Sequence, residues 1–297
     1  MDIVHRPLHT LSLALVFAIT LSACSGMFFF PARKHVQTPD QLGLKYRDIT
    51  LSAADDTQLH AWLLPATKPA RGNILFLHGN AENISTHIYN VRWLPAAGYQ
   101  VLLLDYRGFG QSQGSAQLPE VFLDIDAALN WFTEDPDAAE KDLFILGQSI
   151  GASLMFYAAT QHTGNPELCG LVSDAAFTGY GDIIRHVAAQ SWISWPFQYP
   201  LSWGRYGRYD PINAVSELDA LPILFFHSRD DQIIPFSNLD PLIAKHSGTH
   251  QRAVTEGPHT ATFGRTRNRD TLIDFLSKHS CTTNIPSQVS QDANLRL

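Results

Sequence analysis

The sequence predicts an α/β fold built on a mostly parallel sheet of about eight strands flanked by helices. Short apolar runs alternate with helix-like stretches, which is typical of parallel strands joined by crossover helices. Because the runs are apolar throughout, both faces of the sheet should be covered. The chain has 297 residues, of which 45% are hydrophobic and 16% are charged, so it can bury the core that a sheet of about eight strands requires.

The strands and helices follow one another in a clear order. Alternating polar and apolar residues predict a hairpin that turns at Asp55 and Asp56. Neither a fixed-period repeat nor a flexible linker divides the body, so we expect one domain over residues 44–280. Its predicted strands are 46–53, 58–65, 74–77, 101–104, 143–146, 171–172, 223–226 and 252–255, and its clearest helices are 121–132, 152–158 and 269–278.

An aromatic-rich segment interrupts this alternation between two core strands. Residues 191–209 contain three of the six tryptophans, interspersed with proline and glycine. We expect an insertion at about 178–212 to form a small cap over the carboxyl ends of the strands, where α/β folds bind ligands. The alternative is that these rings only pack the insertion onto the body.

The N-terminus predicts an export signal. Arg6 precedes an uncharged apolar run at 11–21, which is shorter than a membrane-spanning helix requires. The next residues, Leu21-Ser22-Ala23-Cys24, resemble the lipobox of bacterial lipoproteins, in which the chain is cleaved before the cysteine and the thiol receives a diacylglyceryl group. The resemblance implies a signal peptide at 1–23, lipidation at Cys24 and a lipid-anchored linker at 24–43. An uncleaved anchor and an ordinary secretory signal are the alternatives.

The predicted anchor also indicates a location. Ser25 after the lipidated cysteine resembles the sorting pattern of outer-membrane lipoproteins, so we expect a protein of the bacterial cell envelope that faces the periplasm. In that oxidising compartment Cys169 and Cys281 are permitted to pair, although one buried and one exposed thiol is the interpretation that the sequence favours. Polar residues without periodicity predict a flexible tail at 281–297.

The charge balance excludes one class of partner. The chain has 21 Lys and Arg against 28 Asp and Glu, a net charge of −7. It therefore lacks the excess of positive charge that nucleic-acid binding needs. The three cysteines are too scattered to supply the close ligand pairs of a structural zinc site.

A predicted strand–turn–helix carries the candidate nucleophile. The turn reads Gly147-Gln148-Ser149-Ile150-Gly151, which fits the GxSxG pattern. Such a turn holds the serine hydroxyl clear of the backbone, and its glycines avoid collisions with the neighbouring strand and helix. Ser149 is therefore the predicted nucleophile; an inert serine in a glycine-rich turn is the alternative.

A serine hydroxyl needs a base to accept its proton and an acid to orient that base. His259 follows the last predicted strand and is expected at the same edge of the sheet as Ser149. The acid should lie at the end of the preceding strand, where Asp230 and Asp231 are both candidates. Asp174, at the end of an earlier strand, is a more distant alternative.

Acyl transfer passes through an oxyanion that two backbone N–H groups stabilise. The N–H of Ile150, directly after the nucleophile, is one candidate donor. The N–H of Asn80, just after the strand at 74–77, is the other. We expect His78, beside Asn80, to order this loop rather than to act as a base.

Taken together, these segments resemble the α/β-hydrolase superfamily, in the branch of small single-domain esterases and serine-aminopeptidase-like proteins. The resemblance favours Asp231 over Asp230, because the family form has an aliphatic residue and a proline three and four positions after the acid. Two residues depart from the pattern, Glu82 and Ser228, where relatives commonly have glycine. The matching segments are His78-Gly79-Asn80-Ala81, Asp105-Tyr106-Arg107-Gly108-Phe109-Gly110-Gln111-Ser112, the Ser149 turn, Asp231 with Ile234 and Pro235, and His259.

The resemblance implies a carboxylesterase-like serine hydrolase that acts through an acyl-enzyme and needs neither a metal nor an organic cofactor. The aromatic cap and the predicted anchor suit a hydrophobic or lipid acyl ester at a membrane surface. A peptidase or thioesterase of the same fold is the second hypothesis. The third is a lipid-anchored binding protein that has lost catalysis.

Overall fold

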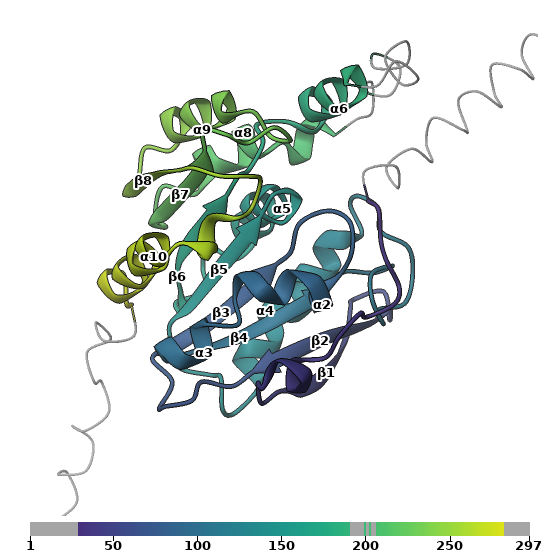
Figure 1. The fold of residues 1–297 in the computed structure, drawn as a ribbon, viewed down its shortest axis with the longest axis vertical. Helices are drawn as coiled ribbons and strands as arrows, with labels where there is room; N and C mark the ends of the chain where they lie inside the picture. The colour runs from purple at the N-terminus through teal and green to yellow at the C-terminus, as the bar shows by residue number, and fades with distance from the viewer. Residues whose placement is uncertain (1–28, 191–198, 200–201, 203–205, 282–297) are drawn as a thin grey trace, which may run out of the picture.

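The computed structural model describes residues 29–190, 199, 202 and 206–281. Its centre is an eight-stranded sheet in the order β1-β2-β4-β3-β5-β6-β7-β8 (Figure 1). β2 is antiparallel to both of its neighbours and all the other pairs are parallel, so the predicted α/β fold is confirmed. The strands are β1 (Arg47–Ser52), β2 (Gln58–Leu64), β3 (Gly72–Leu77), β4 (Tyr99–Asp105), β5 (Leu143–Gln148), β6 (Leu168–Asp174), β7 (Ile223–Ser228) and β8 (His250–Thr255).

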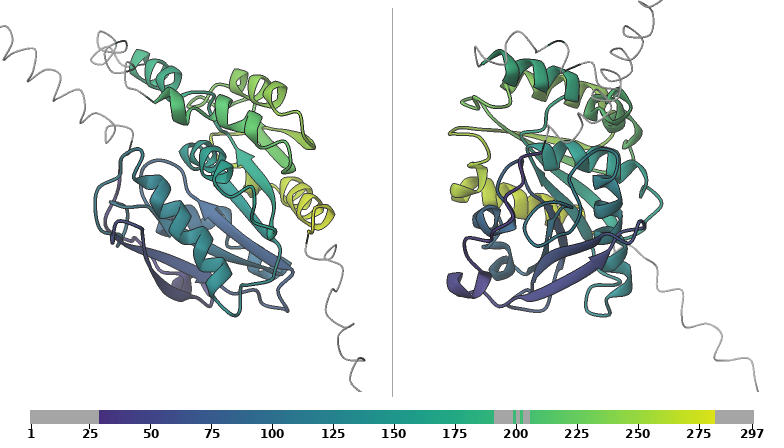
Figure 2. Two further views of the ribbon diagram at one scale, coloured as in Figure 1. Left: turned by 180° about the vertical axis from the view of Figure 1, so that it is seen from behind. Right: turned by 90° about the vertical axis from the view of Figure 1, so that its right-hand side faces the viewer.

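Helices lie on both sides of the sheet (Figure 2). Alternate side chains of β3 show why: Leu75 and Leu77 belong to one hydrophobic core, with α4, α5, α8 and α9, whereas Ile74 and Phe76 belong to another, with α2, α3 and α10. A strand that is buried on both faces needs apolar residues at every position, which explains the unbroken runs in the sequence. The helices are α2 (Ile84–His87), α3 (Leu94–Ala97), α4 (Val121–Glu134), α5 (Ile150–Thr160), α6 (Tyr180–Ala189), α8 (Pro211–Ala214), α9 (Leu239–Lys245) and α10 (Thr266–Lys278).

β6 differs most from its expected range of 171–172, because it begins at Leu168 and ends at Asp174. The strand continues through Ser173 and Asp174, two polar residues that are both buried. Asp174 accepts hydrogen bonds from Gln148 and Thr262, so its burial depends on partners that are distant in the sequence. Hydrophobicity alone therefore ended the predicted strand too early.

Part of the expected cap lies within the described residues. Tyr209 packs against Phe122 and Tyr157, with ring centroids 5.2 and 4.8 Å apart, and Tyr206 packs against Tyr180. Most of the aromatic-rich segment lies outside the described residues, and so do the expected signal peptide 1–23, Cys24 and the tail beyond residue 281. None of the helices in the described part of the chain has the length and apolarity that crossing a bilayer requires.

Residues 29–43, expected as a linker, pack on the body. Phe29 is buried, and its ring meets that of Phe109 edge to face. Pro31 forms a bridge with Glu82, and the N–H of Ala32 donates to the Glu82 carbonyl. We call residues 29–37 the N-terminal strap, because they lie across the loops at the carboxyl edge of the sheet.

A disulfide joins Cys169 in β6 to Cys281 just after α10, with the Cα atoms 5.4 Å apart. The sequence favoured unpaired thiols, because nothing local relates two cysteines that are 112 residues apart. The bond fixes the C-terminal end of α10 to the sheet, where the N–H of Cys281 also donates to Asp142.

Reduction of this disulfide should lower the free energy of unfolding. A bond that closes so long a loop restricts the unfolded chain, which is typically worth about 2–4 kcal/mol. Urea denaturation with and without dithiothreitol measures the difference. The Cys169→Ala/Cys281→Ala variant is the control and should not respond to the reductant; equal stability of the wild type in both conditions would contradict the prediction.

Candidate active site

Ser149 lies in the tight turn between β5 and α5. Its backbone has φ 56° and ψ −120°, a conformation that residues with side chains rarely adopt. β5 ends directly before this residue and α5 begins directly after it. The turn therefore holds the Ser149 side chain at the carboxyl edge of the sheet, as in a nucleophile elbow.

Crowding on both sides of Ser149 explains its glycine neighbours. A Cβ at Gly147 would lie 2.5 Å from Cα of Ala152, and a Cβ at Gly151 would lie 2.1 Å from the carbonyl oxygen of Leu77. Real Cβ contacts are not this short, so only glycine allows α5 to start this close to β3.

His259 and Asp231 are directly hydrogen-bonded. His259 Nδ1 lies 2.6 Å from Asp231 Oδ2, and Asp231 Oδ1 accepts the N–H groups of Ile233 and Ile234 at 2.9 Å each. Burial alone would raise the pKa of Asp231, but the hydrogen bonds from His259 and from the backbone lower it below its usual value. An ionised Asp231 accepts the Nδ1–H, which leaves Nε2 of His259 with its lone pair.

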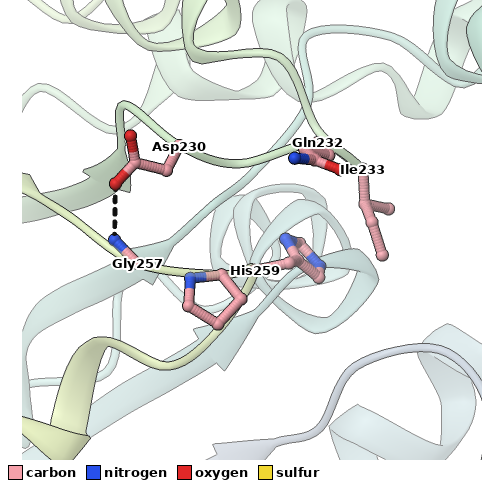
Figure 3. Close-up of a pocket in the computed structure, with 6 residues that line it drawn as sticks. Asp230, Gln232, Ile233, Gly257 and His259 are labelled. Carbon is pink, nitrogen blue, oxygen red and sulfur yellow. Dashed lines mark hydrogen bonds between the residues drawn. The ribbon is translucent and has the colours of Figure 1, made fainter.

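The other two candidate acids have different partners. Asp230 Oδ2 accepts the N–H of Gly257 at 2.8 Å (Figure 3). The hydroxyl of Ser228, one of the departures from the family pattern, donates to the Gly257 carbonyl at 2.6 Å. Both contacts fasten the loop that carries His259 to the end of β7. Of the two adjacent aspartates, the structure brings Asp231 to the imidazole and uses Asp230 to hold its loop.

Asp174 fastens the same loop to the end of β5. It accepts the side-chain amide of Gln148 and the hydroxyl of Thr262, both at 2.7 Å. Burial raises the pKa of Asp174 to about 6. The Gln148 amide also reaches the carbonyl of Thr260 at 3.5 Å. Since Gln148 precedes Ser149 and Thr260 follows His259, these bonds place the two candidate catalytic segments side by side. In the described structure the Ser149 hydroxyl and the His259 ring are not themselves hydrogen-bonded.

The loop after β3 lies against Ser149. A Cβ built at Gly79 would be 3.5 Å from Cβ of Ser149, so Asn80, the next residue, comes to the same edge. The Asn80 side chain accepts the N–H groups of Phe30 and Ala81, which ties the loop to the N-terminal strap. Ile150 is the first residue of α5, and N–H groups at that position have no acceptor within the helix.

Two histidines beside this loop are not part of the Asp231–His259 pair. His78 is fully buried, its Nδ1–H donates to the carbonyl of Gly79, and burial lowers its pKa to about 3. It therefore stays neutral and orders the loop, as the sequence suggested. His87, which sequence reasoning did not single out, stacks on His78 with ring centroids 5.2 Å apart and lies next to Gly79. It belongs to no motif, and only the fold brings it near Ser149.

A pocket of about 590 Å³ opens beside the imidazole (Figure 3). Its one large aliphatic side chain is Ile233, which is half exposed, so an apolar group can be accommodated next to the ring. The pocket is lined by Asp230, Gln232, Ile233, Gly257, Pro258 and His259.

The chain is similar in sequence to several known proteins. Residues 68–208 match the family described as serine aminopeptidase, S33. YfhR of Salmonella typhi, an uncharacterized protein, is 28% identical over 266 residues, which cover 84% of this chain and 86% of that protein. An uncharacterized membrane protein of Saccharomyces cerevisiae is 25% identical over 259 residues, which cover 82% and 84%.

The same fold occurs in a solved esterase of Pyrococcus furiosus. The two structures superpose with a TM-score of 0.68 at 20% sequence identity, over 86% of this chain and 98% of the esterase. At this level of identity the likeness concerns the fold.

The crowding at the Ser149 turn predicts a large difference between two glycine substitutions. Gly151→Ala forces a Cβ into the β3 backbone and should lower the free energy of unfolding by about 3 kcal/mol. Gly164→Ala is the control, because its Cβ would meet nothing within 4 Å, and it should change stability by less than about 0.5 kcal/mol. Urea denaturation of both variants checks this, and equal effects would contradict the packing described here.

Proposed function

We propose that the chain is a serine hydrolase of the α/β-hydrolase superfamily that cleaves acyl esters; the family match over residues 68–208 and the fold shared with a solved esterase support this. Ser149 is the nucleophile, His259 the general base and Asp231 the acid that orients the imidazole. The observation that carries the proposal is the 2.6 Å bond between His259 and Asp231, which lie at the same edge of the sheet as the strained Ser149 turn.

The reaction proceeds in two steps. Ser149 Oγ attacks the carbonyl carbon of the ester as its proton passes to Nε2 of His259. The N–H groups of Ile150 and Asn80 stabilise the oxyanion of the tetrahedral intermediate. His259 then protonates the leaving alcohol, and an acyl-Ser149 ester remains. Water, deprotonated by the same imidazole, attacks this ester and releases the carboxylic acid and free Ser149.

Burial of Asp231 contributes to the chemistry. Its carboxylate is ionised, and two backbone N–H groups fix it in place. It therefore stabilises the imidazolium that forms when His259 accepts the serine proton. We expect the hydrogen bond between Ser149 and His259 to form in the substrate complex, because catalytic hydrogen bonds are often long or misaligned in a free enzyme.

Two features support an ester with an apolar acyl group. Ile233 beside the His259 ring offers an apolar contact in the pocket, and a solved esterase shares the fold. The family description of a serine aminopeptidase favours a peptide substrate as the second candidate.

We also propose that the mature chain is anchored through a lipid on Cys24 in the bacterial cell envelope, facing the periplasm from the outer membrane. The Cys169–Cys281 disulfide supports export, because such bonds persist in oxidising compartments. Phe29, the first described residue, is buried in the body. Five residues span at most about 17 Å, so the anchor would keep the active-site edge close to the membrane.

Substitution of the two adjacent aspartates should separate their roles. Asp231→Asn removes the acceptor that orients His259 and should lower kcat about 10³–10⁴-fold. Asp230→Asn alters the bond to Gly257 and removes a charge from the wall of the pocket, but leaves the His259 contact intact, and should keep kcat/KM within roughly tenfold. Hydrolysis of p-nitrophenyl esters measures both. Equal losses in the two variants would rule out a specific role for Asp231.

A fluorophosphonate probe distinguishes an enzyme from an inactive binding protein. The folded wild type should be labelled, and Ser149→Ala should abolish labelling while the circular dichroism spectrum is unchanged. A folded wild type that takes no label would favour the binding protein. A rate comparison of p-nitrophenyl esters of increasing acyl length with aminoacyl anilides then sets the substrate class: we expect esters to be cleaved faster, and faster anilide cleavage would favour the peptidase.

A further inference from the structure

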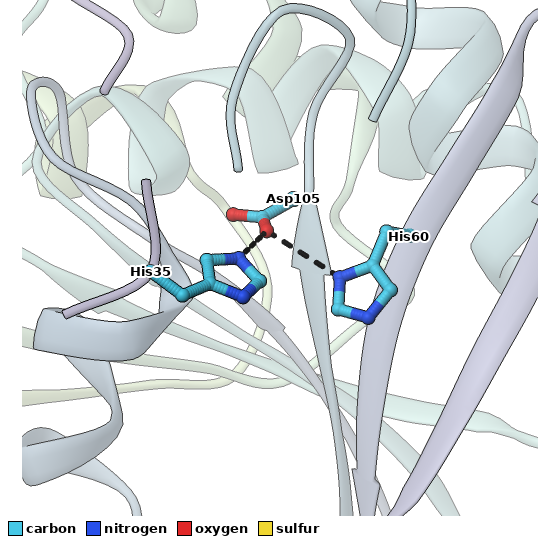
Figure 4. A group of neighbouring side chains, drawn as sticks. All are labelled: His35, His60 and Asp105. Carbon is cyan, nitrogen blue, oxygen red and sulfur yellow. Dashed lines mark hydrogen bonds and ion pairs between the residues drawn. The ribbon is translucent and has the colours of Figure 1, made fainter. Parts of the chain in front are cut away.

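Two histidines and an aspartate meet outside the Ser149–His259–Asp231 group (Figure 4). His35 lies in the N-terminal strap, His60 in β2, and Asp105 ends β4. His35 Nε2 is 2.8 Å and His60 Nδ1 is 3.6 Å from the same atom, Asp105 Oδ2. One ligand atom of each residue therefore lies within 4.8 Å of the others, a spacing at which a single metal ion can contact all three.

We propose that the His35–His60–Asp105 cluster binds one zinc ion through His35 Nε2, His60 Nδ1 and Asp105 Oδ2. Two imidazoles and one carboxylate suit zinc, whereas magnesium and calcium prefer oxygen ligands only. A water molecule would complete a tetrahedral site. The proposal does not depend on the acyl-transfer activity, because none of the three residues belongs to the catalytic group.

The surroundings of His60 resemble those of a metal-bound histidine. Its Nε2 lies 2.8 Å from Asp48 Oδ1, and the same oxygen accepts the indole N–H of Trp62 at 3.0 Å. A carboxylate behind the imidazole fixes the ring and its tautomer, which is the usual outer arrangement of histidine ligands. With the proton on Nε2, the lone pair of His60 Nδ1 points toward Asp105.

That inward nitrogen faces Asp105 Oδ2 at 3.6 Å, which is too long for a hydrogen bond. His60 is 8% exposed, and within the described structure its buried Nδ1 makes no hydrogen bond. A lone pair that faces a buried carboxylate oxygen is unfavourable, and a buried polar atom left unsatisfied costs free energy. A cation between the two atoms would satisfy both.

Asp105 presents one oxygen to the two imidazoles. Its other oxygen, Oδ1, accepts the N–H of Ile84 at 3.0 Å. Its Oδ2 lies 2.8 Å from His35 Nε2 and faces both rings. The carboxylate is fully buried, and a carboxylate oxygen is a usual ligand of zinc.

Gly110 keeps this oxygen uncovered. A Cβ built at Gly110 would lie 1.8 Å from Asp105 Oδ2 and 2.5 Å from His35 Nε2. The residue also has φ +47°, which favours glycine. Any other residue here would place its side chain among the ligand atoms.

A zinc ion at this position would act as a structural clamp. Its ligands come from the strap, β2 and β4, which are distant in the sequence. Asp105 also holds the first residue of α2, Ile84, directly after the loop that contains Asn80. The ion would thus fix the strap and this loop to the sheet without contacting the substrate.

Zinc titration of the full chain after treatment with a chelator tests the proposal. Calorimetry should show one equivalent of Zn²⁺ bound, and the melting temperature should rise with bound zinc. His60→Gln and His35→Gln should each weaken binding by roughly 100-fold, and Asp48→Asn by about 10-fold. Because His35 lies in the strap, its variant leaves the sheet intact and tests the site even where His60→Gln fails to fold.

Two controls guard against adventitious zinc. His162 pairs with Asp126 at 2.9 Å away from the cluster, so His162→Gln should bind zinc like the wild type, and so should His259→Ala. Absence of saturable zinc binding by the wild type would overturn the proposal, since hydrogen bonds alone would then hold the cluster together. Wild-type affinity in both His35→Gln and His60→Gln would overturn it as well, because the zinc would be bound elsewhere.

Discussion

The close approach of β3, β5 and α5 around Ser149 is the constraint on which the rest of the site depends. The helix can begin beside the Leu77 carbonyl only because residue 151 has no side chain, and Ser149 takes up the resulting strain in its backbone. The same contact brings the loop after β3 against Ser149. The positions of the candidate nucleophile and of the candidate oxyanion donors thus depend on the same contact between α5 and β3.

Buried polar bonds then attach the His259 loop to this edge. Asp174 connects it to β5 through Gln148 and Thr262, and Asp230 connects it to β7. Unpaired polar groups would be costly at these depths, so the bonds determine where the loop lies. Asp231 is therefore available to hydrogen-bond the His259 imidazole, while Asp174 and Asp230 hold the backbone of the loop.

Features that depend on residues close together in the chain could be predicted from the sequence. Contacts between residues that are distant in the chain could not. The sheet and the Ser149 turn could be proposed because apolar runs and flanking glycines lie next to one another in the chain. Position alone left two adjacent aspartates as candidates; the family resemblance favoured Asp231, and in the structure Asp231 is the one that lies 2.6 Å from His259 Nδ1. The Cys169–Cys281 disulfide and the His35–His60–Asp105 cluster join residues without any local relation, so no spacing rule could indicate them.

The central claim is that Ser149, His259 and Asp231 act as one unit, and a crystal structure of the chain after reaction with a phosphonate ester tests it most directly. The account predicts phosphorus bonded to Ser149 Oγ, a ring nitrogen of His259 within about 3.2 Å of that oxygen, and the phosphoryl oxygen facing the N–H groups of Ile150 and Asn80. Phosphorus on a different side chain, or a His259 ring that remains beyond hydrogen-bond reach of Ser149 Oγ, would contradict the account.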